Sequence, residues 1–194
     1  METKIKDIKK QILLMDKQLE YYKKNKKLVR IKRDPRIDPD NSYGIVLDYS
    51  DDFILIAYAY DFVMDGWRII DRFFVKEIKA THSDNYCKKI MQKEGLLDDI
   101  DPPIDINISS YKTIFSSFKK HKQFVIVEDE HIEAGVFLIG PVREISKDSV
   151  SIRHFDGNGE WVTGRRGIKF KDISLIQFGN NYIRLHQKYI NTKL

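Results

Sequence analysis

The sequence predicts a mainly β protein (α+β) of two tandem five-stranded barrels, each with flanking helices, preceded by a long N-terminal helix. Three observations predict it: a stretch that occurs twice, short apolar runs separated by turn residues, and heptad spacing near the N-terminus. A hydrophobic content of 42% and a charged content of 32% are typical of globular chains. A length of 194 residues suits one large domain or two small ones, and the duplication favours two.

The duplicated stretch covers residues 44–56 and 140–152, at a constant offset of 96. Gly44 matches Gly140 and Ser50 matches Ser146. In each copy a three-residue turn separates two apolar runs, which predicts an antiparallel hairpin. The repeating unit is therefore expected to be a helix, five strands and a second helix, used twice.

The N-terminal segment, residues 1–27, is expected to be an amphipathic helix. Its apolar residues follow the a/d spacing of a heptad seam, formed by Ile5, Ile8, Ile12, Met15, Leu19 and Tyr22. Two interpretations remain open. The helix packs on the body of its own chain, or residues 5–22 pair with a second copy in a homodimer.

Basic charge is concentrated in the same region. Residues 1–30 carry ten basic and four acidic groups, a net charge of +6, while the whole chain carries +5. Such an arm can follow the phosphates of a nucleic acid. A solvated helix face explains the same charges without a ligand.

Five strands are expected in the first barrel, at residues 28–32, 43–49, 53–61, 66–71 and 74–80, with a turn at Met64-Asp65-Gly66. A helix over 84–94 follows, with Ser83 as its N-cap. The predicted domains are the helix at 1–27, a first barrel with its trailing helix at 28–95, a linker at 96–108, and a second barrel with leading and trailing helices at 109–194. Ser110 is expected to cap the helix over 111–121.

No catalytic constellation is recognisable. Cys87 is the only cysteine, so an intrachain disulfide and a multi-cysteine zinc site are excluded. The five histidines lack metal spacing, and no serine or cysteine lies in a nucleophile motif. We therefore expect no enzymatic activity, no cofactor and no metal. The chain lacks a recognisable signal peptide and a membrane-spanning apolar run, which favours a cytoplasmic protein with no membrane partner.

Aromatic and basic side chains are the candidate binding residues. Trp67 and Trp161 follow the main turn of each copy, where a tryptophan serves as a stacking platform or as a plug for one end of the barrel. Arg165 and Arg166 lie on a tight loop that can contact phosphate or carboxylate groups, or simply form an exposed hairpin tip. The full candidate set is Tyr58, Tyr60, Trp67, His154, Trp161, Arg165 and Arg166.

The arrangement of short strands, a leading helix, the stretch at 44–56 and the late pair Arg166-Gly167 resembles the SH3-like and Sm-like small barrels. The pair occurs in the second copy only; the first has Arg72-Phe73 near that place. The chain also resembles uncharacterised bacterial proteins with tandem copies of such a module. The resemblance implies a fold and carries almost no functional weight.

The expected function is that of a non-enzymatic adaptor that binds another protein through its two barrels. Nucleic-acid binding through the basic arm and the Arg165/Arg166 loop is the first alternative. A toxin-immunity or inhibitor protein, with a single tight protein partner, is the second.

Overall fold

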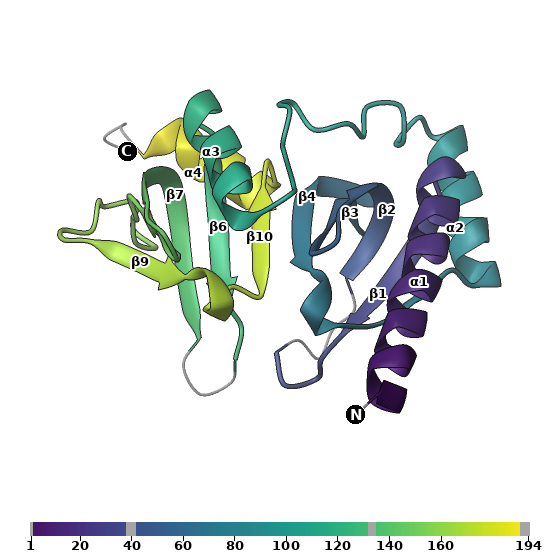
Figure 1. The fold of residues 1–194 in the computed structure, drawn as a ribbon. Helices are drawn as coiled ribbons and strands as arrows, with labels where there is room; N and C mark the ends of the chain where they lie inside the picture. Colours follow the sequence, from purple (N-terminus) through teal and green to yellow (C-terminus); the bar gives the residue numbers. More distant parts are fainter. Residues whose placement is uncertain (1, 38–41, 132–134, 191–194) are drawn as a thin grey trace.

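The computed structural model describes the backbone of residues 2–37, 42–131 and 135–190, with side chains from Gln11 onward (Figure 1). Its helices are α1 (Glu2–Lys24), α2 (His82–Lys93), α3 (Tyr111–His121) and α4 (Asn181–Tyr189). The strands of the first half are β1 (Leu28–Arg33), β2 (Ser42–Tyr49), β3 (Phe53–Tyr60), β4 (Val63–Asp71) and β5 (Val75–Lys79). Those of the second half are β6 (Phe124–Asp129), β7 (Val136–Ile145), β8 (Ser149–Ile152), β9 (Arg166–Lys169) and β10 (Leu175–Phe178).

The mainly β prediction is confirmed, but the closed barrels are wrong. The strands form one open antiparallel sheet in the order β5-β1-β2-β3-β4-β10-β6-β7-β8-β9. Closure would require β4 to pair with β5, whereas residues 67–70 of β4 pair with residues 175–178 of β10. Both of these edges are rich in apolar side chains, so pairing across the halves satisfies their backbone groups and buries apolar surface at once.

The matching stretches of sequence form matching hairpins. Each has a register shift at the same place, between Val46 and Asp48 in one and between Val142 and Glu144 in the other. An added Cβ at Gly44 would lie 2.2 Å from the carbonyl oxygen of Ala57 on β3. An added Cβ at Gly140 would lie 2.1 Å from the carbonyl oxygen of Arg153, just after β8. Glycine is needed at both places because two backbones cross closely there.

The third and fourth strands are joined differently in the two halves. The predicted turn at residues 64–66 is wrong: Asp61 and Phe62, both with positive φ, form the turn. Gly66, with φ +74°, instead lies in β4 at a register shift. In the second half residues 153–165 connect β8 to β9, so Trp161 lies outside the named strands while Trp67 lies within β4. The two tryptophans, which the sequence places at matching positions, therefore lie in different structural elements.

The hydrophobic cores interlock across the halves. One core contains Ile114, Phe115 and Phe118 of α3 together with Leu55 of β3. Another core, beneath α1, contains Leu175 of β10 together with the inward side chains of the first half. Each half therefore completes its core with side chains that the other half supplies.

A buried ion pair reinforces this junction. Arg33, at the end of β1, is 1% exposed. Its guanidinium donates two hydrogen bonds to Glu130 across 97 residues of sequence, at 2.6 and 2.8 Å. Ser174 donates to the same carboxylate at 2.6 Å. The bidentate geometry and the additional donor compensate the desolvation of the buried Arg33 and the partly buried Glu130.

Part of the heptad seam of helix α1 packs against the body of its own chain. Leu19 is fully buried, and Met15 and Tyr22 pack beside it against the first half. Ile12 is 50% exposed. The predicted seam residues Ile5 and Ile8 lie outside the described side chains. Among the described helices none combines the length and apolarity needed to cross a membrane.

Helix α2 is fixed by a capping box at Thr81, not at the predicted Ser83. The Asp84 carboxylate accepts from the Thr81 backbone at 2.7 Å and from Arg30 of β1 at 2.9 Å. Burial opposes ionisation of Asp84, but the bonds from Thr81 and Arg30 outweigh it and lower its pKa. Asp84 thus holds α2 against β1 as a carboxylate. The predicted cap of α3 at Ser110 is confirmed.

We predict that Asp84→Asn lowers the free energy of unfolding at pH 7 by about 2 kcal/mol, because it weakens both a cap and the ion pair of the buried Asp84 with the half-exposed Arg30. A carboxyl whose pKa is lowered by folding stabilises the protein above its unfolded pKa of about 3.9, and this contribution is lost as the pH falls through the folded pKa. The difference between Asp84→Asn and wild type should therefore shrink between pH 7 and pH 3 in urea unfolding.

Asp99→Asn is the matched control, because Asp99 is exposed and the same charge is removed. It should leave the unfolding free energy nearly unchanged at both pH values. An equal loss for the two variants, or a loss for Asp84→Asn that is independent of pH, would contradict the assigned role.

Candidate functional site

Helix α4 is anchored at its start by both halves of the molecule. Asn180 caps it by accepting from the Ile183 backbone at 2.9 Å. The Asn181 backbone donates to Asp65 of β4 at 2.6 Å. Just before the helix, Gly179 has φ +64°, and an added Cβ there would lie 2.4 Å from the Trp67 ring. Only glycine allows the chain to turn into α4 against this tryptophan.

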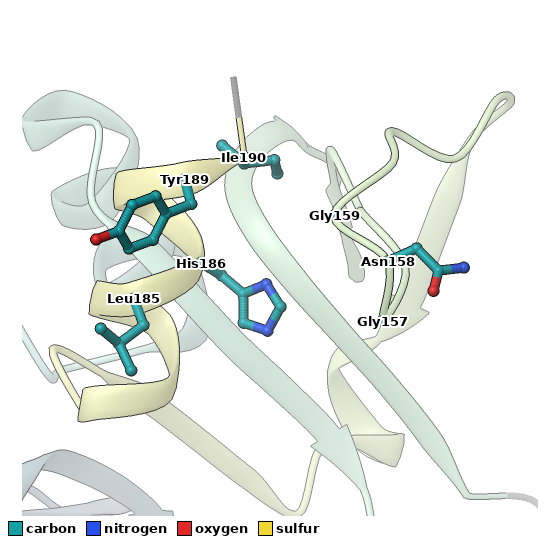
Figure 2. Close-up of a pocket in the computed structure, with 7 residues that line it drawn as sticks. All are labelled: Gly157, Asn158, Gly159, Leu185, His186, Tyr189 and Ile190. Atoms are coloured by element: carbon teal, nitrogen blue, oxygen red, sulfur yellow. The ribbon is translucent and has the colours of Figure 1, made fainter. Parts of the chain in front are cut away.

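A groove of about 470 Å³ lies between α4 and the loop that joins β8 to β9 (Figure 2). Its lining residues are Gly157, Asn158, Gly159, Leu185, His186, Tyr189 and Ile190. In Figure 2 the His186 ring points from α4 towards the loop, and the Asn158 side chain points away from the helix. The His186 ring lies 5.1 Å from Phe155, which is fully buried beneath the groove.

Internal hydrogen bonds hold the loop side of the groove. The Asp156 carboxylate accepts from the backbones of Asn158 and Glu160, at 2.9 and 3.0 Å. These backbone bonds, that of Glu160 first, lower the pKa of Asp156. The groove is therefore bordered by a preformed turn whose carboxylate is already engaged.

Large apolar side chains are exposed beside this groove. Tyr182, Leu185 and Tyr189 of α4 are 47, 46 and 41% exposed, and Phe137 of β7 is 45% exposed. The rings of Phe137 and Tyr182 lie 6.4 Å apart. On the neighbouring side of the helix Ile183 is buried in the core. We call these four exposed residues the α4 face; they form one apolar surface across a helix and a strand.

A second cavity, of about 430 Å³, lies at the junction of the halves and is lined in part by Asp71, Phe73 and Tyr111. Burial raises the pKa of Asp71, against bonds from Phe73 and Tyr111 that lower it. The Tyr111 hydroxyl donates to Asp71 at 2.8 Å and lies 3.1 Å from the Ile173 carbonyl. These contacts tie the first half, α3 and the second half together, so the perturbed carboxyl has a structural explanation.

The candidate residues of the first half do not form one site. Trp67 stacks on Phe178 and donates to the Ile100 carbonyl at 2.8 Å, in the manner of a plug. The Arg68 guanidinium lies over the Tyr58 ring, 3.4 Å from the centre of that ring. Tyr60 is 65% exposed at the end of β3.

Those of the second half lie on the connection between β8 and β9 or at its end. His154 accepts from the Ile139 backbone at 3.1 Å, and Trp161 packs beneath Arg153 at 4.2 Å. Arg165 lies 3.4 Å from Glu144. Arg166 is exposed at the start of β9. Trp161 also packs against the core beneath the groove, which includes Ile183 of α4.

Sequence reasoning missed the α4 face. The available signal is the distribution of apolar residues around the helix: Ile183 and Ile190 lie on one side, and Tyr182, Leu185 and Tyr189 lie on a neighbouring stripe. The stripe of Ile183 and Ile190 packs α4 on the core, so the second stripe is available for another contact.

Comparisons with protein families, with curated proteins and with solved structures find no match to this chain. Among the described residues no group of His, Cys, Asp and Glu side chains is arranged to hold a metal ion.

Proposed function

We propose that this is a non-enzymatic binding protein, in which two SH3-like copies of one module carry a docking surface for another protein at the α4 face. The exposure of the α4 face is the observation that carries the proposal. A contiguous exposed group of tyrosine, phenylalanine and leucine side chains is characteristic of protein-protein interfaces. The neighbouring groove adds a concave region in which a partner side chain can be buried.

The anchoring of α4 also supports this role. Its N-terminus is fixed by Asp65 of the first half and its inner side by Ile183 of the second. A rigid helix loses little conformational entropy when a partner binds, so more of the contact energy contributes to affinity. The duplication of the module is supported by the common strand order of the halves and by their matching hairpins.

We predict that Leu185→Asp abolishes capture of the partner protein in affinity purification from the source cells. A charge in the centre of an apolar interface should weaken binding by roughly 30-fold or more. Tyr86→Ser is the matched control, because it removes an exposed apolar side chain on α2, a helix that packs on β1 of the first half. Capture that survives Leu185→Asp unchanged would contradict the proposal, provided that both variants melt at the wild-type temperature.

Nucleic-acid binding is the second candidate, and the stacking of Arg153 on Trp161 beside the exposed Arg165 and Arg166 favours it. It requires salt-sensitive binding of single-stranded RNA or duplex DNA in fluorescence anisotropy. Arg165→Gln with Arg166→Gln should then reduce affinity about tenfold at low salt. Deletion of residues 1–27 is a poor test, since it removes the buried Leu19. No binding at low salt would exclude this candidate.

A further inference from the structure

The outer edge of β9 is an unused strand edge. In the described part of the chain β9 pairs only with β8. The Phe170 backbone donates to Asp148 at 2.8 Å, and hydrogen-bonded pairs alternate along an antiparallel ladder. Ile168 and Arg166 therefore bond to β8, while the N–H and C=O groups of Gly167 and Lys169 are directed outward. Gly167 has no side chain to shield them.

The chain itself shows how such an edge is used. In the first half the Arg72 backbone donates to Asp52 at 2.8 Å, which is the counterpart of the bond from Phe170 to Asp148. β4 thus occupies the place that β9 occupies in the second half. The outer edge of β4 accepts β10, with Ile69 opposite Ile176. The fourth strand of a half can therefore pair with a further antiparallel strand on its outer edge.

Positive charge distinguishes the β9 edge from the others. Arg166 and Lys169 are exposed, and neither forms an ion pair with a residue that the structure describes. On β5, the opposite edge of the sheet, Lys76 and Lys79 already contact Asp34 and Glu77, at 3.3 and 3.1 Å. The uncompensated cations therefore lie beside the outward backbone groups of β9.

We propose that the β9 edge binds an extended acidic segment of a partner protein, which adds to the sheet as a further antiparallel strand. Backbone groups of the segment bond to Gly167 and Lys169, and its carboxylates lie beside Arg166 and Lys169. Strand addition of this kind takes affinity from the main chain and specificity from the side chains. The proposal concerns a surface separate from the α4 face and does not rest on it.

A second copy of the chain fits this edge less well. The free edges of a second copy are β9 itself, with Arg166 and Lys169, and β5, with Lys76 and Lys79, so either pairing would place basic side chains opposite basic ones. Like charges on facing strands are destabilising. β10, the strand that β4 accepts, carries no charged residue. An acidic strand is therefore the complementary partner for β9.

The test is the anisotropy of a fluorescein-labelled peptide, Glu-Val-Glu-Thr-Glu-Val-Glu, titrated with the full-length protein. Two peptides serve as controls. Glu-Pro-Glu-Thr-Glu-Pro-Glu carries the same charge but cannot form a regular strand. Lys-Val-Lys-Thr-Lys-Val-Lys forms a strand with the opposite charge. The proposal requires binding of the first peptide only.

Lys169→Pro separates strand addition from simple charge attraction. Lys169 has φ −75°, which proline adopts without strain, and its N–H is directed away from β8. The substitution should leave the fold intact while it removes an outward donor. We expect Lys169→Pro to bind the acidic peptide about tenfold more weakly than Lys169→Gln, which removes the same charge but keeps the N–H. Lys79→Gln, the same charge change on β5, should bind as wild type does.

Each other outcome would overturn the proposal. Equal affinity of Lys169→Pro and Lys169→Gln for the peptide would show that charge attraction explains the binding without strand addition. Displacement of the peptide by single-stranded RNA, with RNA bound more tightly, would make the edge part of a nucleic-acid surface. Self-association in sedimentation that Lys169→Pro abolishes would assign the edge to a second copy. Capture through Leu185 is measured separately, so failure at β9 leaves the α4 proposal standing.

Discussion

Pairing of β4 with β10 holds the two halves in one sheet and decides where most of the other features lie. Through it Phe178 stacks on Trp67, and Leu175 completes the core beneath α1. The Arg33–Glu130 ion pair joins the ends of β1 and β6, which are separated by four strands in the sheet order, so the twisted sheet must curve to bring them together. The two halves are consequently dependent on one another, although their strand order is the same.

The junction also positions both proposed binding surfaces. α4 begins directly after β10, so its direction is set where Gly179 meets Trp67 and where Asp65 accepts from Asn181. The β9 edge remains free because β10 is paired with β4 and β6. Apolar edges meet inside the molecule and charged edges remain outside, which is a common way for proteins to limit further sheet growth.

Local features of the fold could be predicted and non-local ones could not. The two hairpins follow from short turns between apolar runs, and the cap of α3 follows from Ser110, whereas α2 is capped by Thr81 and not by the predicted Ser83. The turn at Asp61-Phe62 is not marked by glycine, whereas Gly66 is used at a register shift, so the turn was misplaced. Open pairing and barrel closure bury the same apolar side chains, so hydrophobic pattern alone does not distinguish them.

For the candidate sites too, local features could be predicted from the sequence and non-local ones could not. Arg165 and Arg166 were expected on an exposed loop because of their local sequence, and Arg166 in fact begins the β9 edge. The α4 face was missed because exposure depends on which side of the helix meets the core. Likewise, the sequence near Arg33 does not indicate that its partner is Glu130, which is 97 residues away.

Amide hydrogen exchange followed by NMR tests the central role of the junction most directly. If β4 and β10 hold the halves together, the amides of Ile69 and Ile176 should be among the slowest to exchange, with the rate set by global unfolding. The cores of the two halves should then open together. Rapid exchange at Ile69 and Ile176, with the remaining strands of each half still protected, would show that the halves are independent and would contradict the account.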